Sequence, residues 1–439
     1  MKTAALLFSL CFSMLKADEL RLHFKPDDHA LGDVHPFFHG GECFLYYLKP
    51  GKYDSMLVRS RDSLHWTPQP LTHAPATAED WMSPYFVLGV LRDESAGLFR
   101  SFHGHAKGRM VSQTSRDMIH WECAPRAFHV PSSDYYERRR DPFVFWIPEQ
   151  KCYGCVMTTW IKGRAKPSGG GVSLATSPDL QNWTDHGIVL DLGNQDEPEC
   201  PQMFQIGTRW YLLTSIYQSR SVGGPVYYTA NRPVGPWTFG GRLDGKDLCA
   251  AQCARDAKNR LMLYGWMPLT PATAEKQTWG GHLALAREIH ALPDGSLATR
   301  LSPDIAQTLD KLVWTSHGGP SRTLIESCLK FGAGFTLASP SFRLDFPPLG
   351  FVAFSEKHIR ICDATGTCWS ELETQWNGKA TVSVFVEEDR VEVFCADRFS
   401  LCARLPAAGG PLKVSWSAGE PSAAPGDIRT SLLNAAPKP

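Results

Sequence analysis

Three acidic residues in the first half of the chain share one local pattern. Asp33, Asp141 and Glu199 each stand one to three positions before a proline, at the start of an apolar, strand-like run. Paired carboxylates hydrolyse glycosidic bonds, because one stays ionised as nucleophile while the other carries a proton for the leaving group. A like charge nearby raises the pKa of that second group. Brought into one pocket, the three acids predict glycoside hydrolysis.

The second acid ends a run of arginines within the stretch YERRRDPFVFW, residues 136–146. Arg140 adjoins Asp141, and its guanidinium would hold the carboxylate ionised or bind a sugar hydroxyl. We therefore expect Asp141 to be an anion that orients the sugar rather than the proton donor. Glu197 is a rival to Glu199 as proton donor, although it would face the other side of the strand start.

Four short segments ending in tryptophan recur along the first 240 residues. They read SRDSLHW, SRDMIHW, SPDLQNW and NRPVGPW, and their tryptophans lie 55, 62 and 54 residues apart, at positions 66, 121, 183 and 237. Strand-like runs flank each segment, and a fifth unit without it follows. Repeats of about this length built from four strands indicate a β-propeller. We expect five blades within residues 18–305. An array of sandwiches without radial closure is the alternative, but closure protects the sheet edges.

Beyond residue 310 the tryptophan segments stop and alternating strands continue, for example ATVSVFVEEDRVEVF. This pattern predicts a β-sandwich over residues 310–420. Residues 421–439 are rich in Pro, Ala and Ser, and we expect them to form a flexible tail. The predicted fold is thus all-β, a five-bladed propeller followed by a C-terminal β-sandwich.

Composition narrows the classes of partner. The chain has 439 residues, of which 43% are hydrophobic, and 45 basic residues balance 45 acidic ones. Such a globular chain with a net charge of zero suggests neither nucleic acid nor membrane as a partner. Residues 1–17 combine Met1-Lys2 with an apolar run, as in a signal peptide, so we expect the protein to be secreted or periplasmic.

Thirteen cysteines are present, and 12 remain once the leader segment is set aside. An even number is compatible with disulfides in an oxidising compartment. Cys152 and Cys155 form a C-x-x-C pair inside a strand-like run, where we expect plain packed residues rather than a redox or zinc site. No metal site is expected.

Four stretches of the chain resemble glycoside hydrolase family 32, which includes invertases, levanases and inulinases. They are the RDP motif at 140–142, the ECP motif at 199–201, the run GWMPLTPATAEKQTWGGHLALAREIHALPDGSLATRLSP, and the sandwich strand in RVEVFCADRFSLCAR. The similarity covers most of residues 22–405. It implies the propeller and sandwich already expected, a carbohydrate substrate, and no metal or organic cofactor.

The resemblance also implies roles for the three acids. By position, Asp33 is the nucleophile, Asp141 the transition-state stabiliser that binds sugar hydroxyls, and Glu199 the general acid/base. Together they imply a retaining double displacement through a covalent glycosyl-enzyme. The implied substrates are β-fructofuranosides, such as fructans, fructo-oligosaccharides or sucrose.

The first motif departs from the family pattern. The family has WMNDPNG, whereas this chain has LGDVHP, so Leu31 and Gly32 replace the Trp and Asn before the aspartate. Leu48 replaces a Gln that often ends the next strand. These positions shape the subsite that holds the sugar, so we expect the chemistry to survive and leave the identity of the sugar open.

Further residues are candidates for substrate binding beside Arg140. Ser83 takes the place of an acid in the second blade, and His35 could supply a replacement hydrogen bond or be structural. Trp81 and Trp279 could stack on sugar rings, as could Trp266, although such residues also pack between blades. Cys200 could tune the pKa of the neighbouring acid or be a small buried residue.

Two other functions remain open at this point. An inverting arabinofuranosidase on a related propeller would need its carboxyl groups more than about 6.5 Å apart, against about 5 Å for retention. A catalytically silent carbohydrate-binding propeller is the other, and the presence of all three acids argues against it. The sequence sets neither the oligomeric state nor an endo or exo mode.

Overall fold

The computed structural model describes most of the chain. The described residues are 20–51, 54–73, 89–105, 109–123, 136–164, 169–193, 198–216, 223–271, 279–318, 321–328, 330–337, 341–374, 379–418 and 428–433. The expected leader, residues 1–17, lies outside them. No helix among these residues is long and apolar enough to cross a membrane.

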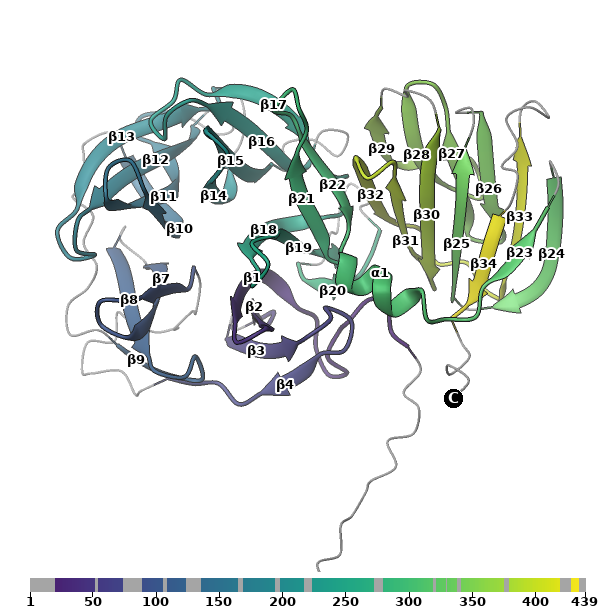
Figure 1. Ribbon diagram of the computed structural model, residues 1–439, viewed down its shortest axis with the longest axis horizontal. Helices are drawn as coiled ribbons and strands as arrows, with labels where there is room; N and C mark the ends of the chain where they lie inside the picture. The colour runs from purple at the N-terminus through teal and green to yellow at the C-terminus, as the bar shows by residue number, and fades with distance from the viewer. Residues whose placement is uncertain are drawn as a thin grey trace, which may run out of the picture.

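Five sheets, antiparallel except for one short parallel pairing in the second, follow one another along the first 300 residues and stand around a common centre, forming a five-bladed propeller (Figure 1). Blade one comprises β1 (Gly32–His39), β2 (Glu42–Leu48), β3 (Ser55–Ser60) and β4 (Thr67–Gln69). Blade two comprises β5 (Thr72–His73), β6 (Leu91–Asp93), β7 (Leu98–His105), β8 (Arg109–Ser115) and β9 (His120–Cys123). Blade three comprises β10 (Tyr136–Ile147), β11 (Cys152–Ile161), β12 (Gly170–Ser177) and β13 (Thr184–Asp191).

Blade four comprises β14 (Glu199–Ile206), β15 (Arg209–Ile216), β16 (Gly224–Ala230) and β17 (Thr238–Arg242). Blade five comprises β18 (Cys249–Arg255), β19 (Leu261–Pro268), β20 (Gly281–Leu283), β21 (Arg287–Ala291) and β22 (Leu297–Leu301). Leu31 and Gly281 exchange backbone hydrogen bonds at 2.7 and 3.1 Å, which joins blade one to blade five. The ring therefore closes between the first and last blades.

The tryptophan segments of the sequence mark the turn between the third and fourth strands of a blade. In blade one the Ser60 hydroxyl bonds Asp62, whose carboxylate accepts the backbone N–H groups of Leu64 and His65. Blades two and three repeat this turn around Asp117 and Asp179. The sequence repeat thus records a recurring side-chain-to-backbone turn, a use for which Asp and Ser are suited.

Two six-stranded sheets form the second domain, a β-sandwich (Figure 1). One has the order β23 (Thr315–His317), β34 (Ile428–Leu432), β25 (Lys330–Leu337), β30 (Ala380–Glu387), β31 (Arg390–Cys395) and β32 (Phe399–Arg404). The other has the order β24 (Ser321–Cys328), β33 (Leu412–Ala418), β26 (Phe342–Phe346), β27 (Gly350–Phe354), β28 (His358–Asp363) and β29 (Cys368–Glu373). The helix α1 (Pro303–Leu309) precedes the sandwich.

One boundary expected from the sequence was wrong. Within the supposed tail, residues 421–439, Ile428–Leu432 forms strand β34 and pairs with β23 and β25. Ile428 is 1% exposed and belongs to the sandwich core. Residues 428–432 are held in place because they lie between β23 and β25, whose facing backbone groups would otherwise lack partners. The sandwich thus extends beyond residue 420.

Buried ion pairs connect the two domains. Arg287 of the propeller pairs with Asp244 of the propeller at 3.0 Å and also with Glu392 of the sandwich. Asp244 in turn accepts the backbone N–H of Cys402 at 2.8 Å.

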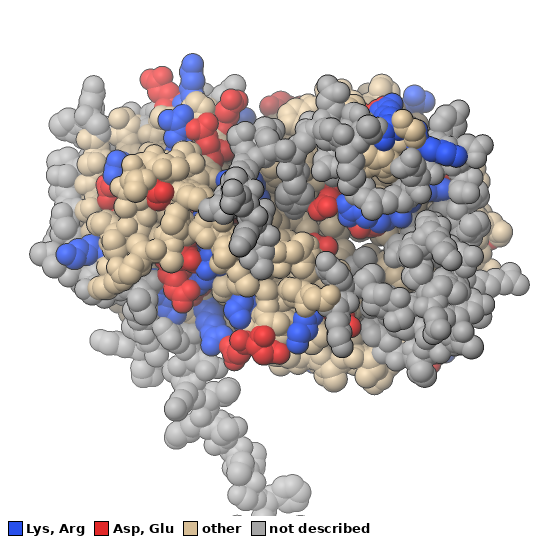
Figure 2. Space-filling view, turned by 180° about the vertical axis from the view of Figure 1, so that it is seen from behind, with Lys and Arg blue, Asp and Glu red and all other residues tan. Residues whose placement is uncertain are grey.

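On the face shown in Figure 2, acidic and basic side chains are interspersed, as the zero net charge suggests.

Candidate active site

The innermost strands of four blades carry a β-bulge at the same place. In β1, β10, β14 and β18 the pairing register shifts at residues 32–35, 140–143, 199–202 and 249–252. One residue in each bulge has a positive φ: Asp33 at 40°, Asp141 at 51°, Cys200 at 49° and Ala250 at 43°. Because a bulge bends its strand and re-aims a side chain, this repeated distortion directs one side chain per blade toward the propeller axis.

The three acids do not occupy equivalent positions in these bulges. Asp33 and Asp141 stand at the positive-φ position itself, whereas Glu199 is one residue earlier and aligns with Arg140 and Gly32. The spacing to proline, which singled out all three, concealed this offset. Arg140 of blade three and Glu199 of blade four therefore occupy equivalent positions on neighbouring inner strands.

Arg140 joins two of the carboxylates. Its guanidinium donates to Asp141 Oδ2 at 2.7 Å and to Glu199 Oε1 at 2.9 Å. The same Asp141 oxygen accepts the Cys200 backbone N–H at 3.2 Å. The Thr158 hydroxyl lies 3.3 Å from that oxygen but donates to the Pro198 carbonyl at 2.6 Å. These donors offset the repulsion between the acids and fix the orientation of the Asp141 carboxylate.

The pKa of Asp33 is raised by its surroundings. Burial, followed by the charges of Glu199 and Asp141, raises its pKa to about 7 against a weaker lowering by Arg140. The sequence led us to expect a raised pKa on the proton donor. The structure shows a raised pKa on Asp33, the residue expected as nucleophile. The three carboxylates are thus close enough for the charges of Glu199 and Asp141 to affect Asp33.

Two tryptophans of blade five flank Asp33. The Trp279 indole lies against Gly32, where an added Cβ would come within 2.5 Å of it. Trp266 contacts Trp279 edge to face, with ring centroids 5.9 Å apart. Among the described residues, the buried indole N–H of Trp266 has no partner at hydrogen-bond geometry, and it lies close enough to Asp33 to act against the effect of burial on that pKa. An aromatic wall with a donor beside a carboxylate is suited to a sugar ring.

Comparison with known proteins identifies the family. Residues 23–300 match the profile of the glycosyl hydrolases family 32 N-terminal domain. The chain belongs to glycoside hydrolase family 32. It is 26% identical over 259 residues to sucrose-6-phosphate hydrolase of Escherichia coli, and this match spans 52% of each protein, about half of the relative's length.

Solved structures of the family share the whole fold. The chain resembles sucrose-6-phosphate hydrolase from Lactobacillus gasseri, with a TM-score of 0.72, 15% identity and coverage of 95% of this chain and 94% of the other. Fructan 1-exohydrolase IIa from Cichorium intybus gives a TM-score of 0.74, 14% identity and coverage of 96% and 98%. At these identities the likeness establishes the propeller and sandwich.

The residues that depart from the family motif lie beside Asp33. Leu48 pairs with Gly32 across β1 and β2 and is buried, so an apolar side chain stands where the family often has an amide. His35 is 5% exposed, and burial lowers its pKa to about 4, so the imidazole is neutral at pH 7. Its Nδ1 has no hydrogen-bond partner among the described residues.

Cys200 reaches the acids through its backbone. Burial, followed by the charges of Asp141, Asp33 and Glu199, raises the pKa of its thiol well above the usual value, so the side chain carries no charge. Its backbone N–H is the group that contacts Asp141. Three sequence candidates, Trp81, Ser83 and Glu197, lie outside the described residues.

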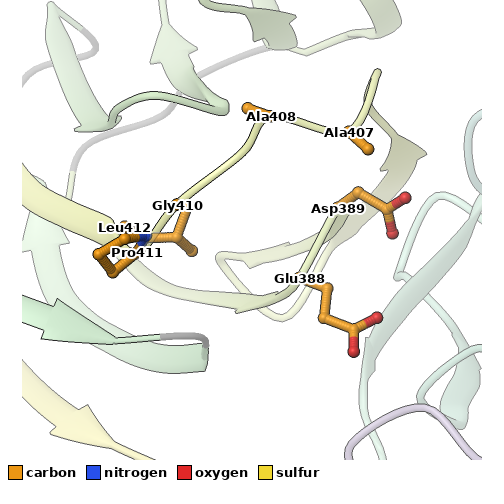
Figure 3. Close-up of a pocket in the computed structure, with 7 residues that line it drawn as sticks. All are labelled: Glu388, Asp389, Ala407, Ala408, Gly410, Pro411 and Leu412. Carbon is orange, nitrogen blue, oxygen red and sulfur yellow. The ribbon is translucent and has the colours of Figure 1, made fainter.

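Two cavities are lined by none of the three acids. One, of about 470 Å³, begins at the residues that close the bulges, such as His35 and Gln202, and follows the inner strands to Gln205 and Arg255. The other, of about 390 Å³, lies on the sandwich between Glu388, Asp389 and residues 407–412 (Figure 3). Arg404 neutralises Asp389 there at 2.7 Å. The described residues contain no group of three or more His, Cys, Asp and Glu arranged to hold a metal ion.

Proposed function

We propose that the protein is a retaining glycosidase acting on β-fructofuranosides. The observation that carries the proposal is the bridge from Arg140 to both Asp141 and Glu199, with Asp33 close enough for their charges to affect it. Membership of glycoside hydrolase family 32 supports it. The relatives include a sucrose-6-phosphate hydrolase and a fructan exohydrolase, so sucrose 6-phosphate should be tested together with sucrose and fructans.

In the proposed reaction, the ionised Asp33 carboxylate attacks the anomeric carbon of the fructosyl unit. Glu199 donates its proton to the departing glycosidic oxygen, which leaves a covalent fructosyl-enzyme. Glu199 then removes a proton from water, and the resulting attack releases fructose and restores Asp33. Asp141, held by Arg140 and the Cys200 N–H, binds sugar hydroxyls and stabilises positive charge at the anomeric centre.

The first experiment is hydrolysis of a panel of substrates: sucrose, sucrose 6-phosphate, inulin, levan, short fructo-oligosaccharides and arabinofuranosides. Asp33→Ala and Glu199→Ala should each abolish fructose release. Glu149→Ala is the matched control, because this exposed carboxylate bonds Gln205 at the far ends of the inner strands. A covalent fructosyl adduct on Asp33 in the Glu199→Ala protein would identify the nucleophile by mass spectrometry.

The panel also tests the other functions. Cleavage of arabinofuranosides alone, with inversion at the anomeric carbon, would replace the proposal by the inverting enzyme. Binding of a sugar without cleavage of any substrate would establish a carbohydrate-binding propeller.

We also propose that the protein is exported to the periplasm or secreted, on the strength of the apolar run that follows Lys2. N-terminal sequencing of the protein purified from its natural source tests this. A mature chain that begins near residue 18 is expected, and a chain that retains Met1 would overturn the proposal.

A further inference from the structure

Two cysteines of the sandwich face each other across a hairpin. Cys362 on β28 and Cys368 on β29 are direct partners in the antiparallel pairing. The adjoining pair, Asp363 and Thr367, is joined by a backbone hydrogen bond of 3.0 Å. Cys362 and Cys368 lie next to this pair, and the register shifts just beyond them, between Ile361 and Cys362. Cα atoms of residues paired across antiparallel strands are about 4.5–5.5 Å apart. That spacing falls within the range a disulfide requires, about 4.4–6.8 Å.

The loop between the two cysteines is already ordered. The Asp363 carboxylate accepts the backbone N–H groups of Thr365 and Thr367, at 2.9 and 3.0 Å, and the Trp369 indole N–H at 2.8 Å. Closing a bond between Cys362 and Cys368 would therefore demand little rearrangement. A preformed loop is the condition under which a disulfide avoids native-state strain.

The two thiols also differ in reactivity. The interaction between the paired thiols is the main cause that lowers the pKa of Cys368 to about 7 while it raises that of Cys362. The Cys368 thiol also donates to the Ser370 carbonyl at 3.4 Å. Cys368 is exposed, whereas Cys362 is buried. An exposed thiol that ionises near neutral pH, next to a second thiol, has the arrangement of an attacking and a resolving cysteine.

We propose that Cys362 and Cys368 are a disulfide-forming site, oxidised by exchange with a small disulfide such as oxidised glutathione. The Cys368 thiolate attacks one glutathione sulfur, forming a mixed disulfide and releasing one glutathione thiolate. Cys362 then loses its proton and attacks the Cys368 sulfur, which releases the second glutathione. Two protein thiols are thus oxidised, one glutathione disulfide is reduced, and the two protons end on two glutathione molecules.

The position of the hairpin makes this bond relevant to the whole molecule. Ser370, two residues after Cys368, lies against the propeller segment that contains Gly245, where an added Cβ would be 2.1 Å from the Ser370 hydroxyl. Lys246 lies over the Trp369 ring at 5.8 Å. The disulfide would therefore fix the hairpin that packs on the propeller, beside the buried Asp244.

The direct test is a non-reducing peptide map of the full-length protein after incubation with oxidised glutathione, followed by alkylation of remaining thiols. We expect a peptide pair linked through Cys362 and Cys368, while Cys152 stays alkylated. Cys152 is the matched control, because it is half-buried, its thiol pKa is raised by burial, and no other described cysteine is its pairing partner. Free thiols at both positions, or pairing of either with another cysteine, would overturn the proposal.

Two variants separate the steps. In Cys362→Ser the reaction should stop at a stable glutathione adduct on Cys368, and in Cys368→Ser neither residue should be modified. Oxidation should raise the thermal midpoint of the wild-type protein by a few degrees, on the order of 5 °C, and leave both variants unchanged. A glutathione adduct that persists on Cys368 in the wild-type protein would show that the ring does not close. This test does not depend on hydrolytic activity.

Discussion

Arg140 and Glu199, from neighbouring blades and 59 residues apart in sequence, are joined by a hydrogen bond of 2.9 Å. Each stands immediately before the positive-φ residue of its own bulge. The repeated backbone distortion therefore creates a contact between side chains of opposite charge at equivalent points. The same guanidinium reaches Asp141, so one residue fixes the relative orientation of the proposed stabiliser and acid/base.

Replacing Arg140 by Lys should lower kcat/KM by about 10²-fold or more, because a lysine retains the charge but cannot donate to two carboxylates in fixed geometry. Arg140→Gln should lower it further and move the acidic limb of the pH profile to higher pH, since the guanidinium charge lowers the pKa of Asp33. Steady-state kinetics with the best substrate of the panel measures both effects. Unchanged kinetics in Arg140→Lys would remove the bridge from the mechanism.

The raised pKa of Asp33 predicts how activity varies with pH. The proposed nucleophile must be ionised, and its pKa is about 7, so kcat/KM should rise as the pH increases through about 7 in the free protein. Substitution of the neighbouring carboxylate, Asp141→Asn, removes one like charge and should shift this limb to lower pH even as the maximal rate falls. A limb near pH 4 in the wild-type protein would contradict the assignment.

The raised pKa of Asp33 also predicts a trade-off between stability and function. The folded state binds the Asp33 proton more tightly than the unfolded state does, so stability should fall as pH rises from about 4 to 7. Asp33→Asn abolishes that dependence, and it should be more stable than the wild type above pH 7, by up to a few kcal/mol, while inactive. Urea unfolding at about pH 5 and pH 8 measures the difference. A variant that is less stable at both pH values would contradict this account.

Parts of this architecture could be predicted from the sequence because their causes are local. The tryptophan segments revealed the blades, since the same Ser and Asp side chains close the same turn around Asp62, Asp117 and Asp179. Residues at strand starts near the axis were similarly visible as acids before proline. Both signals depend on a few adjacent residues.

Other features depend on pairing and burial that no local pattern reports. The offset of Glu199 from Asp33 and Asp141 appears only when the ladder registers are aligned. The raised pKa of Asp33 results from its burial among distant charges. Strand β34 could not be recognised among Pro, Ala and Ser, because its partner β25 precedes it by about 90 residues.

His23 predicts a pH-dependent link between the domains. Its buried ring bonds Glu387 at 2.8 Å and Glu392 at 2.9 Å. Burial alone would lower its pKa, but the two carboxylates outweigh burial and raise it. The stabilisation is thus complete below the unfolded value of about 6.5 and is lost as pH rises through the raised folded value.

His23→Gln should therefore cost about 3–5 kcal/mol at pH 6, since two buried carboxylates lose a cation, and less at high pH. Chemical denaturation at pH 6, and again at a pH above the raised pKa of His23, measures this loss in the free energy of unfolding. His65→Gln is the control, because the exposed side chain of that histidine bonds the turn residue Asp62. An equal cost at both pH values would show that His23 acts by packing alone.

Gly32 predicts how closely the aromatic wall must approach the acids. Gly32→Ala should push the Trp279 indole away, since the new Cβ would come within 2.5 Å of it. If that indole holds the sugar against Asp33, KM should rise about tenfold or more, with a smaller change in thermal midpoint. Trp279→Ala should have a similar effect on KM, and the two substitutions combined should not be additive because they remove one contact.

Gly409→Ala is the control, because nothing lies within 4 Å of its added Cβ. Wild-type KM in Gly32→Ala, or additive losses in the double variant, would show that Trp279 only packs between blades one and five.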